Sequence, residues 1–290
     1  MLRLIVVVFA LAGWQAPAIL SAQAFRMPIV AEAITVERDV IYGRPDGAAL
    51  LADLAYPVAA TGLPAIVYVH GGRWTSGERV GRMQLYVEEW AKAGFFAMTI
   101  SYRLAGSSPA PAGYQDLLCA IRWLHTHAAK YHVDPDRIYL VGNSSGGHVV
   151  SLAATIGDGP YPRAGGWKEA RGDVRAVISI AAPYELNTLS WGNLWTPLNA
   201  SSPVEVQQAR RTASPLHQIT SRTRPMLIIH SDDDQSVPVQ QAVDMVAALA
   251  KADVPHKFVR YKDRGHMRLT DEVLKEMLTF IAEFEAPTRR

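Results

Sequence analysis

A serine between two glycines is the residue of this chain whose surroundings best suit nucleophilic chemistry. Residues 138–152 form an apolar run, a turn of small residues and a segment that can continue as a helix, and the turn holds the pattern Gly142-x-Ser144-x-Gly146. A serine at such a strand-to-helix corner is exposed above the sheet, and glycines flank it because a Cβ would clash there. The pattern predicts Ser144 as a nucleophile beside a helix N-terminus whose N–H groups can stabilise an oxyanion.

The five-residue pattern by itself fits an ordinary turn equally well. Its flanks favour the nucleophile interpretation. Residues Arg137–Val141 form a short apolar run of strand type, and an Asp134-Pro135-Asp136 turn precedes them. The strand, turn and helix that the motif requires are therefore all expected here.

A catalytic serine needs a base, and His266 is the histidine best placed for that role. Only His256 and His266 follow both the serine and the candidate acids. His256 opens an apolar strand at the end away from the expected site, whereas His266 lies on a glycine-containing loop after that strand. The histidines expected on helices, on the surface or in a cap-like segment are His125, His127, His132, His148 and His217.

The candidate acids are three consecutive aspartates, Asp232–Asp234, which follow the apolar run Pro225–Ile229. A run of charges after a strand is often only a solvated turn. However, the order serine, aspartate, histidine, with the last two on loops at strand ends, is typical of a catalytic triad in a parallel α/β sheet. At this level, the three aspartates remain alternatives.

A fourth motif lies upstream, where the apolar strand Ala65–Val69 runs into His70-Gly71-Gly72-Arg73-Trp74. With four motifs in this order over roughly 200 residues, the chain resembles the α/β-hydrolase superfamily. Within it, the chain is similar to bacterial esterases related to hormone-sensitive lipase and to feruloyl- and acetylxylan-esterase-type enzymes. The resemblance implies an α/β-hydrolase fold, with a mostly parallel sheet of about eight strands, helices on both faces and a small cap insertion.

The resemblance also selects among the aspartates. The family pattern His-Gly-x-x-Asp-x-x-Val-Pro aligns with His230–Pro238, with Ser231 in place of the glycine. This alignment places Asp234 in the catalytic position and leaves Asp232 as the alternative. The implied mechanism is ester hydrolysis through an acyl-enzyme, with His266 as the base that the aspartate orients.

In relatives of this kind, backbone N–H groups bind the oxyanion, and the matching groups here belong to Gly71, Gly72 and Ser145. His70 resembles the histidine that supports the geometry of this loop without transferring protons. Arg73 stands where many relatives of hormone-sensitive lipase carry a third glycine. The motif therefore resembles the form found in feruloyl-esterase-like and arylformamidase-like enzymes, and activity on esters of tertiary alcohols is not indicated.

Three tryptophans, Trp74, Trp191 and Trp195, are candidates for lining an acyl or aryl pocket, and packing is an equally good interpretation. No metal or cofactor is expected, because Asp232–Asp234 lacks the spaced ligands and the following glutamate of a calcium loop. The single cysteine, Cys119, lies in an apolar helical stretch and is expected to be buried. One cysteine excludes an intrachain disulfide.

Strand-like and helix-like segments alternate along most of the chain, which favours a mostly parallel sheet covered by helices. The expected strands are residues 34–42, 50–56, 65–69, 95–101, 137–141, 174–181, 225–229 and 256–261, and the first two form an antiparallel hairpin at one edge. The expected helices are residues 80–93, 112–131, 204–211, 237–251 and 270–284, together with the helix after Ser144. Between residues 183 and 223 the alternation lapses, which predicts a cap-like insertion in a single domain, residues 25–290.

The amino terminus has the pattern of an export signal. A short basic start, an apolar run over Leu4–Ala12 and small residues in Ser21–Ala24 predict a cleaved signal peptide, residues 1–24, and a secreted or periplasmic protein. A membrane anchor is the alternative. We do not expect a stable anchor, because Gln15 and Pro17 interrupt the apolar stretch.

The composition excludes some classes of partner. With 29 basic and 27 acidic residues, a net charge of +2 gives no basis for a nucleic-acid or polybasic membrane partner.

Together, the motifs, the resemblance and the amino terminus predict a secreted serine carboxylesterase that acts on small or medium esters, either small molecules or esters linked to polysaccharide. An arylformamidase-like amidase, a serine peptidase of the same fold and a non-catalytic binding module are the alternatives. Acyl preference, alcohol preference and oligomeric state remain open.

Overall fold

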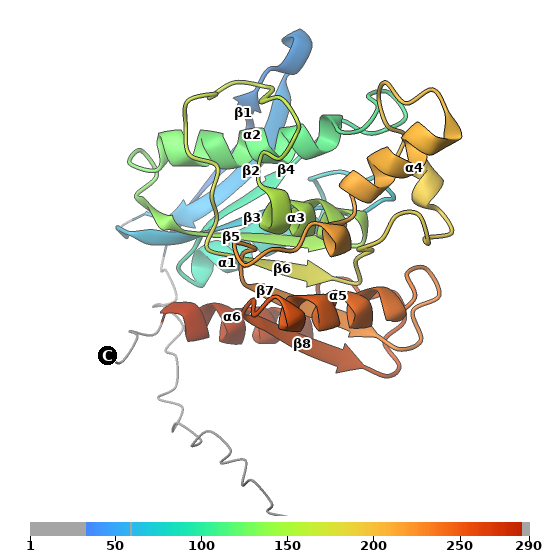
Figure 1. Ribbon diagram of the computed structural model, residues 1–290. Helices are drawn as coiled ribbons and strands as arrows, with labels where there is room; N and C mark the ends of the chain where they lie inside the picture. Colours follow the sequence, from blue (N-terminus) through green and yellow to red (C-terminus); the bar gives the residue numbers. More distant parts are fainter. Residues whose placement is uncertain (1–32, 59, 286–290) are drawn as a thin grey trace, which may run out of the picture.

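The computed structural model describes residues 33–58 and 60–285, which form a central sheet with helices on both faces (Figure 1). The predicted signal peptide, residues 1–24, lies outside the described residues, as do the first residues of the predicted domain. The antiparallel hairpin expected at one edge of the sheet is formed by the first two strands.

Eight strands pair in the order β1-β2-β4-β3-β5-β6-β7-β8. They are β1 (Ile34–Gly43), β2 (Leu50–Pro57), β3 (Leu63–Val69), β4 (Phe96–Ile100), β5 (Val133–Asn143), β6 (Ala176–Ile180), β7 (Met226–Ser231) and β8 (His256–Tyr261). The pairs β1 with β2 and β2 with β4 are antiparallel, and all the others are parallel. The predicted α/β-hydrolase fold, with a mostly parallel sheet of eight strands, is confirmed.

The helices divide between two hydrophobic cores, one on each face of the sheet. They are α1 (Arg82–Lys92), α2 (Ala112–His127), α3 (Ser145–Ile156), α4 (Pro203–Thr212), α5 (Gln240–Lys251) and α6 (Asp271–Glu285). Buried residues of α2, α3 and α5 share one core, and those of α1 and α6 share the other. Every residue of β3 and β4 is buried, as expected for apolar strands that are covered on both faces.

This topology brings the predicted motifs together. Strands β3 and β5 are neighbours, and so are β7 and β8. In a parallel sheet, the carboxyl ends of the strands lie at the same edge. The loops that follow these four strands carry the glycine motif, the nucleophile, the aspartates and His266, and all four loops leave the sheet at that edge.

Two boundaries differ from the sequence prediction by four residues, and the other differences are smaller. The residues Asp134–Asp136, expected as a turn before the strand, lie within β5, where the register slips and several residues stand opposite one residue of β3. The turn is retained locally, because the Asp134 side chain accepts the backbone N–H of Asp136 at 3.0 Å. Helix α2, expected to reach Tyr131, ends at His127, and the chain then turns so that Tyr131 packs on Phe96 with ring centroids 5.2 Å apart.

The segment predicted as a cap, residues 183–223, contains helix α4 and two short 3₁₀ helices, η2 (Gly192–Leu194) and η3 (Pro215–His217). Figure 1 shows α4 standing apart from the sheet, and none of its residues is buried. Its start is fixed by a capping box, in which the side chains of Ser202 and Glu205 each accept a backbone N–H of the other residue.

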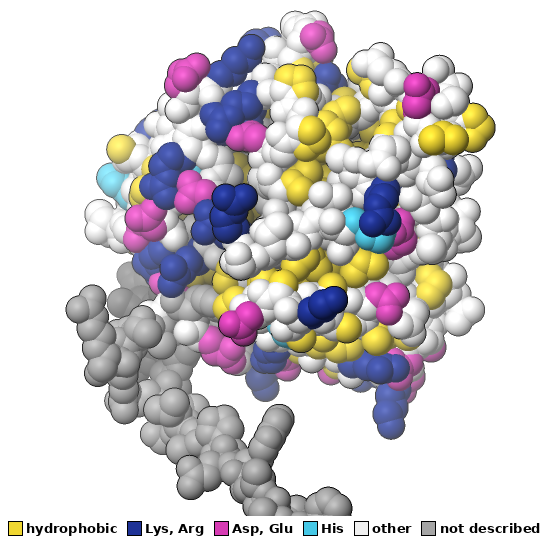
Figure 2. Space-filling view, in the orientation of Figure 1, with side chains coloured by type: hydrophobic (Ala, Val, Ile, Leu, Met, Phe, Trp, Pro, Cys, Tyr) yellow, Lys and Arg dark blue, Asp and Glu magenta, His cyan; other side chains and the backbone are white. Residues whose placement is uncertain are grey.

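Acidic and basic side chains lie next to one another on the face seen in Figure 2. This mixture fits the small net charge of the chain, +2. Among residues 33–58 and 60–285, no helix has the length and apolar character needed to span a bilayer.

Candidate active site

Ser144 sits at the sharp corner between β5 and α3, and its backbone has φ 54° and ψ −125°. Residues other than glycine rarely adopt this backbone conformation. A Cβ on Gly142 would lie 2.4 Å from the carbonyl oxygen of Gly146, and a Cβ on Gly146 would lie 2.2 Å from that of Val69. The Ser144 N–H donates to the Ile180 carbonyl at 2.8 Å, so the neighbouring strand holds the corner. Crowding by backbone on both sides explains the glycine pattern.

Hydrogen bonds connect Ser144, His266 and Asp234 in one line. Nε2 of His266 lies 3.0 Å from Oγ of Ser144, and Nδ1 of His266 lies 2.8 Å from Oδ2 of Asp234. The three residues come from the corner after β5, the loop after β8 and the loop after β7. The serine and the aspartate are buried, and the histidine is partly exposed. In this geometry the imidazole can take the hydroxyl proton at Nε2 while the carboxylate holds the proton on Nδ1.

Two backbone N–H groups and two histidine rings surround the carboxylate of Asp234. Its Oδ1 accepts the backbone N–H groups of Ser236 and Val237 at 2.8 and 2.9 Å. Its Oδ2 faces His266 and also lies 3.3 Å from Nε2 of His230. Nε2 of His230 also lies 2.9 Å from the Val237 carbonyl, which is its shorter contact. Burial raises the pKa of Asp234, but hydrogen bonds from the two histidines and from the Val237 N–H outweigh burial and hold this pKa well below its usual range. Asp234 is therefore ionised at neutral pH.

The two neighbouring aspartates have other partners. Asp232, the alternative acid, pairs with an arginine of β8. Asp233 accepts from the Ser231 hydroxyl at 2.6 Å and from the Gly265 N–H at 2.8 Å. The Ser231 hydroxyl oxygen in turn accepts the Arg264 N–H at 2.9 Å. The serine that replaces the family glycine therefore ties the loop of the acid to the loop of the base.

The loop of residues 70–74, called the oxyanion loop below, differs from its prediction at Gly71. The Gly71 N–H donates to Oδ1 of Asn143 at 3.2 Å, and the same oxygen accepts the Tyr68 hydroxyl at 2.7 Å. Gly71 is therefore not a free donor, because the side chain next to the nucleophile already uses its N–H. In the part of the chain that the structure describes, the backbone N–H groups of Gly72 and Ser145 donate to no protein acceptor. Ser145 opens α3, where helix N–H groups are unpaired.

His70 holds the same loop from the other side. Its Nδ1 donates to the Gly71 carbonyl at 2.7 Å, and its ring stacks on Tyr102 with centroids 4.4 Å apart. The Tyr102 hydroxyl donates to the His70 carbonyl at 3.1 Å. Burial lowers the pKa of His70, although its hydrogen bond to Gly71 opposes this effect. A neutral imidazole whose Nδ1–H holds the Gly71 carbonyl matches the supporting role expected for this residue.

The three tryptophans predicted as pocket candidates lie in the core, and none of them lines the cavity at Ser144. The Trp74 ring packs on Trp191 and Trp195, with centroids 5.1 and 5.4 Å apart. The Trp74 indole N–H donates to Nδ1 of His148 at 3.2 Å, and Nε2 of His148 donates to the Ala213 carbonyl at 2.7 Å. These contacts correspond to the packing interpretation. They join the oxyanion loop, α3 and the cap-like segment through one buried histidine.

The nucleophile and the base line a cavity of about 630 Å³. Its walls come from the oxyanion loop, the first turn of α1 and the loop after the base. Three arginines, Arg73, Arg82 and Arg268, line this cavity together with one acidic residue, Glu78. All four of these side chains are exposed.

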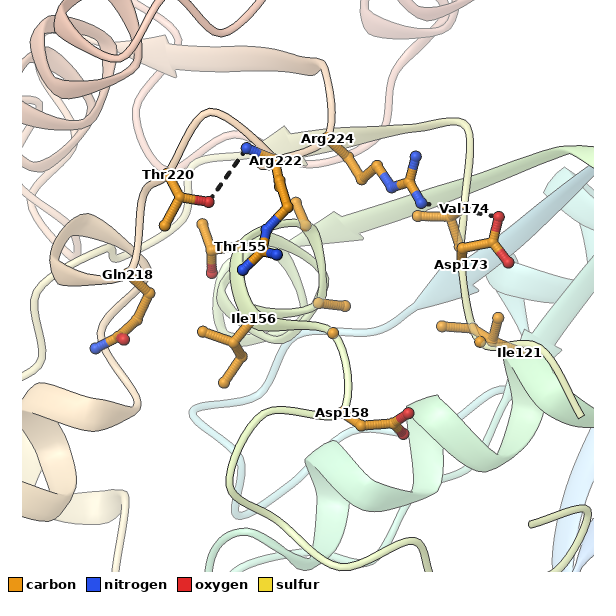
Figure 3. Close-up of a pocket in the computed structure, with 14 residues that line it drawn as sticks. Ile121, Thr155, Ile156, Asp158, Asp173, Val174, Gln218, Thr220, Arg222 and Arg224 are labelled. Atoms are coloured by element: carbon orange, nitrogen blue, oxygen red, sulfur yellow. Dashed lines mark hydrogen bonds and ion pairs between the residues drawn. The ribbon is translucent and has the colours of Figure 1, made fainter. Parts of the chain in front are cut away.

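A second cavity, of about 540 Å³, lies at the other end of α3 (Figure 3). Thr155 and Ile156 from the helix line it, and Arg224 reaches across its edge to pair with Asp173 at 3.8 Å. Helix α3 has 12 residues, so this cavity lies roughly 18 Å from Ser144. No predicted site residue lines it.

Two further observations concern metal ligands and the cysteine. Searched over the described residues, the structure contains no group of three or more His, Cys, Asp or Glu side chains that could hold a metal ion. Cys119 is buried, and burial raises its pKa to about 11. A protonated, buried thiol is a poor nucleophile.

Sequence reasoning missed three features of this site: the side chain of Asn143, the contact of His230 with Asp234, and the arginines of the cavity. His230 belongs to the motif that located Asp234, so the motif contained a signal that was not interpreted. Asn143 is the unspecified residue of the nucleophile pattern. Arg73 belongs to the glycine motif, but its place in the cavity wall was not predicted, and Arg82 and Arg268 lie outside any motif. For these, only the three-dimensional arrangement shows what the side chains contact.

Comparison with known proteins finds similarity to several proteins named as esterases. The BD-FAE family model matches residues 52–249. The chain is 30% identical over 201 residues to the probable carboxylic ester hydrolase LipM of Mycobacterium tuberculosis. The matched region covers 66% of this chain and 46% of the relative. The chain is also 25% identical over 272 residues to the probable isoprenylcysteine alpha-carbonyl methylesterase ICMEL1 of Arabidopsis thaliana, which covers 85% of this chain and 56% of the relative. The chain thus spans about half the length of these relatives.

Solved structures show the same fold. A truncated carbohydrate esterase from gut microbiota has a TM-score of 0.71 at 26% identity, with 86% of this chain and 96% of that chain covered. The thermophilic esterase Est2 of Thermogutta terrifontis, bound to butyrate, has a TM-score of 0.73 at 23% identity, with 92% of this chain and 100% of that chain covered. Because the family model matches more than half of its residues, the chain belongs to the BD-FAE family of α/β-hydrolase-fold proteins.

Proposed function

We propose that the chain is a serine carboxylesterase that hydrolyses small or medium carboxylic esters through Ser144, His266 and Asp234. The observation that supports this most is the line of hydrogen bonds, 2.8 and 3.0 Å long, that runs from carboxylate to imidazole to hydroxyl. This line ends at a cavity of about 630 Å³, a volume that suits a small organic substrate. The relatives named as carboxylic ester hydrolase and esterase support ester chemistry.

In the first half-reaction, Oγ of Ser144 attacks the ester carbonyl carbon while Nε2 of His266 takes the hydroxyl proton. The carbonyl oxygen becomes an oxyanion, for which the N–H groups of Gly72 and Ser145 are the available donors. His266 then gives the proton to the alcohol oxygen as the acyl–oxygen bond breaks. The alcohol leaves, and the acyl group remains on the serine.

In the second half-reaction, water attacks the acyl-enzyme while His266 takes one of its protons. The same proton returns to Oγ of Ser144 as the acyl–serine bond breaks, which releases the carboxylic acid and the free enzyme. Asp234 stays ionised throughout and stabilises the imidazolium that forms in each half-reaction. Its buried carboxylate, held by two backbone N–H groups, is suited to this role.

The proposed substrates include esters linked to polysaccharide, because one of the similar solved structures is a carbohydrate esterase. Export is part of the proposal, because the first 24 residues have the pattern of a signal peptide. Amino-terminal sequencing of protein recovered outside the cytoplasm should begin at Phe25. A protein that keeps Met1 would argue against cleavage.

The first experiment compares the wild type with Ser144→Ala on 4-nitrophenyl esters from acetate upward. We expect Ser144→Ala to lower kcat by several orders of magnitude, because it removes the hydroxyl that forms the acyl-enzyme in the proposed mechanism. Ser107→Ala, which alters an exposed serine on a surface loop, is the matched control and should keep wild-type rates. Equal activity of the wild type and Ser144→Ala, or no hydrolysis by either, would refute the proposed function.

A further inference from the structure

The wall of the cavity at Ser144 carries a local excess of positive charge. Arg73, Arg82 and Arg268 line it against the single carboxylate of Glu78. The whole chain is almost neutral, with 29 basic and 27 acidic residues, so this excess belongs to the cavity and not to the general surface. A cleft lined by one sign of charge concentrates ligands of the opposite sign.

These arginines also differ from most others in their partners. Ten other arginines among the described residues form ion pairs with Asp or Glu, whereas Arg73, Arg82 and Arg268 form none there. The guanidinium of Arg73 lies 5.4 Å from the centre of the Trp191 ring. This contact leaves its N–H groups available to a ligand. Guanidinium groups without an acidic partner are well suited to binding a carboxylate through two N–H groups.

Packing places Arg82 and Arg268 on the same part of the wall. Arg82 begins α1, and the Tyr86 hydroxyl of this helix donates to the Leu269 carbonyl at 2.7 Å. Met267 and Leu269 are buried, and Arg268 between them is exposed. Helix α1 and the loop of the base are therefore joined beside the two arginines. The positive end of the α1 helix dipole lies on the same wall.

The position of Arg268 indicates which part of the ester it would meet. Arg268 follows the base, His266, by two residues. In the proposed mechanism the base gives its proton to the leaving alcohol, so the alcohol part of the substrate must pass beside this loop. The acyl part, in contrast, becomes bonded to Ser144. An acidic group on the alcohol part would therefore come close to the arginines of this wall.

We infer that the site takes esters whose alcohol part carries a carboxylate, such as an acylated sugar acid, and that Arg82 and Arg268 bind this carboxylate. Arg73 adds to the positive charge of the same cavity. The inference rests on the proposed esterase function and names the substrate class of that site.

The test compares 4-acetoxybenzoate, which carries a carboxylate on its alcohol part, with its neutral methyl ester. The quantity measured is the ratio of kcat/KM for the anionic ester to that for the neutral ester. We expect this ratio to fall about tenfold in the double variant Arg82→Gln/Arg268→Gln, because charge-assisted contacts to the carboxylate are lost. Comparing ratios between proteins removes the difference in intrinsic reactivity between the two esters.

Arg222→Gln is the matched control, because Arg222 is an exposed arginine of the second cavity with no acidic partner among the described residues. Its ratio should equal that of the wild type. If both esters are hydrolysed in a Ser144-dependent way and the double variant keeps the wild-type ratio, the inference is overturned while the esterase function stands.

A binding measurement tests the arginines independently of catalysis. Calorimetric titration with 4-hydroxybenzoate, the alcohol product, compares Ser144→Ala with the triple variant Ser144→Ala/Arg82→Gln/Arg268→Gln. We expect the Kd of the triple variant to be about tenfold higher. Adding Arg222→Gln to Ser144→Ala should leave the Kd unchanged. Equal affinity for 4-hydroxybenzoate and its methyl ester would overturn the inference, even in a protein that hydrolyses neither probe.

Discussion

Replacing Asp234 by asparagine changes one atom of the side chain, and the structure dictates where that atom must go. Oδ1 of Asp234 accepts the backbone N–H groups of Ser236 and Val237, at 2.8 and 2.9 Å. In Asp234→Asn this position must therefore hold the amide oxygen. The amide NH₂ then replaces Oδ2, which lies 2.8 Å from Nδ1 of His266. Because an NH₂ group only donates, Nδ1 must become an acceptor, and the ring proton moves to Nε2.

This tautomer removes the base from the reaction. Nε2 lies 3.0 Å from Oγ of Ser144 and, once protonated, cannot accept the hydroxyl proton. We expect kcat of Asp234→Asn to fall about 10⁴-fold, which corresponds to about 5 kcal/mol of transition-state stabilisation. KM should change little, because Asp234 is buried and does not line the cavity.

The assay is steady-state hydrolysis of 4-nitrophenyl acetate by the wild type, Asp234→Asn and Asp232→Asn at neutral pH. Asp232 pairs only with an arginine at the surface, so Asp232→Asn should stay within about twofold of the wild type. Thermal unfolding of each variant checks that the fold is intact. Near-normal activity of Asp234→Asn, or a loss of similar size in Asp232→Asn, would refute the assignment of the acid.

Two further predictions concern the supports of the site. Burial lowers the pKa of His148 from its ordinary 6.5 to about 4. Between these pH values the unfolded chain binds a proton at this histidine that the folded chain excludes. The free energy of unfolding should therefore fall by about 3 kcal/mol as the pH drops from about 6.5 to 4. His148→Gln should remove this part of the pH dependence, which urea unfolding at several pH values measures; identical slopes for both proteins would contradict it. Asn143→Ala leaves the Gly71 N–H without its acceptor and should lower kcat about tenfold with little change in KM. Tyr68→Phe keeps that hydrogen bond and should lower kcat less. Equal losses of kcat in the two variants, measured by steady-state assays, would contradict a role of Asn143 in positioning the loop.

Much of the architecture could be predicted from the sequence because each motif obeys a local constraint. Around Ser144 the backbone is so crowded that only glycine fits on either side, and this requirement appears directly in the residue pattern. Apolar runs such as Ala65–Val69 predicted strands that are covered on both faces, and β3 is buried along its whole length. The alternation of strand-like and helix-like segments, together with the family resemblance that the motifs show, then predicted the mostly parallel sheet on which they lie.

The residues that the sequence did not predict depend on contacts between distant segments. The side chain of Asn143 reaches the Gly71 N–H, 72 positions away, and so occupies a group predicted as an oxyanion donor. The three tryptophans have the residue type of a pocket wall, but a buried histidine and one another are their actual neighbours. No periodicity or composition distinguishes a tryptophan that packs from one that binds substrate. That distinction requires the coordinates of both partners.

The catalytic serine and aspartate are buried and hydrogen-bonded, whereas the arginines of the cavity wall are exposed. Substitutions can therefore affect catalytic activity and substrate preference separately. Ser144 and Asp234 are buried, and hydrogen bonds with backbone groups of neighbouring strands and loops hold them in place. Arg82 and Arg268 are exposed, with no acidic partner among the described residues, and their removal costs the fold little. Substitutions on this wall should therefore change which alcohols the enzyme accepts while leaving the triad in place.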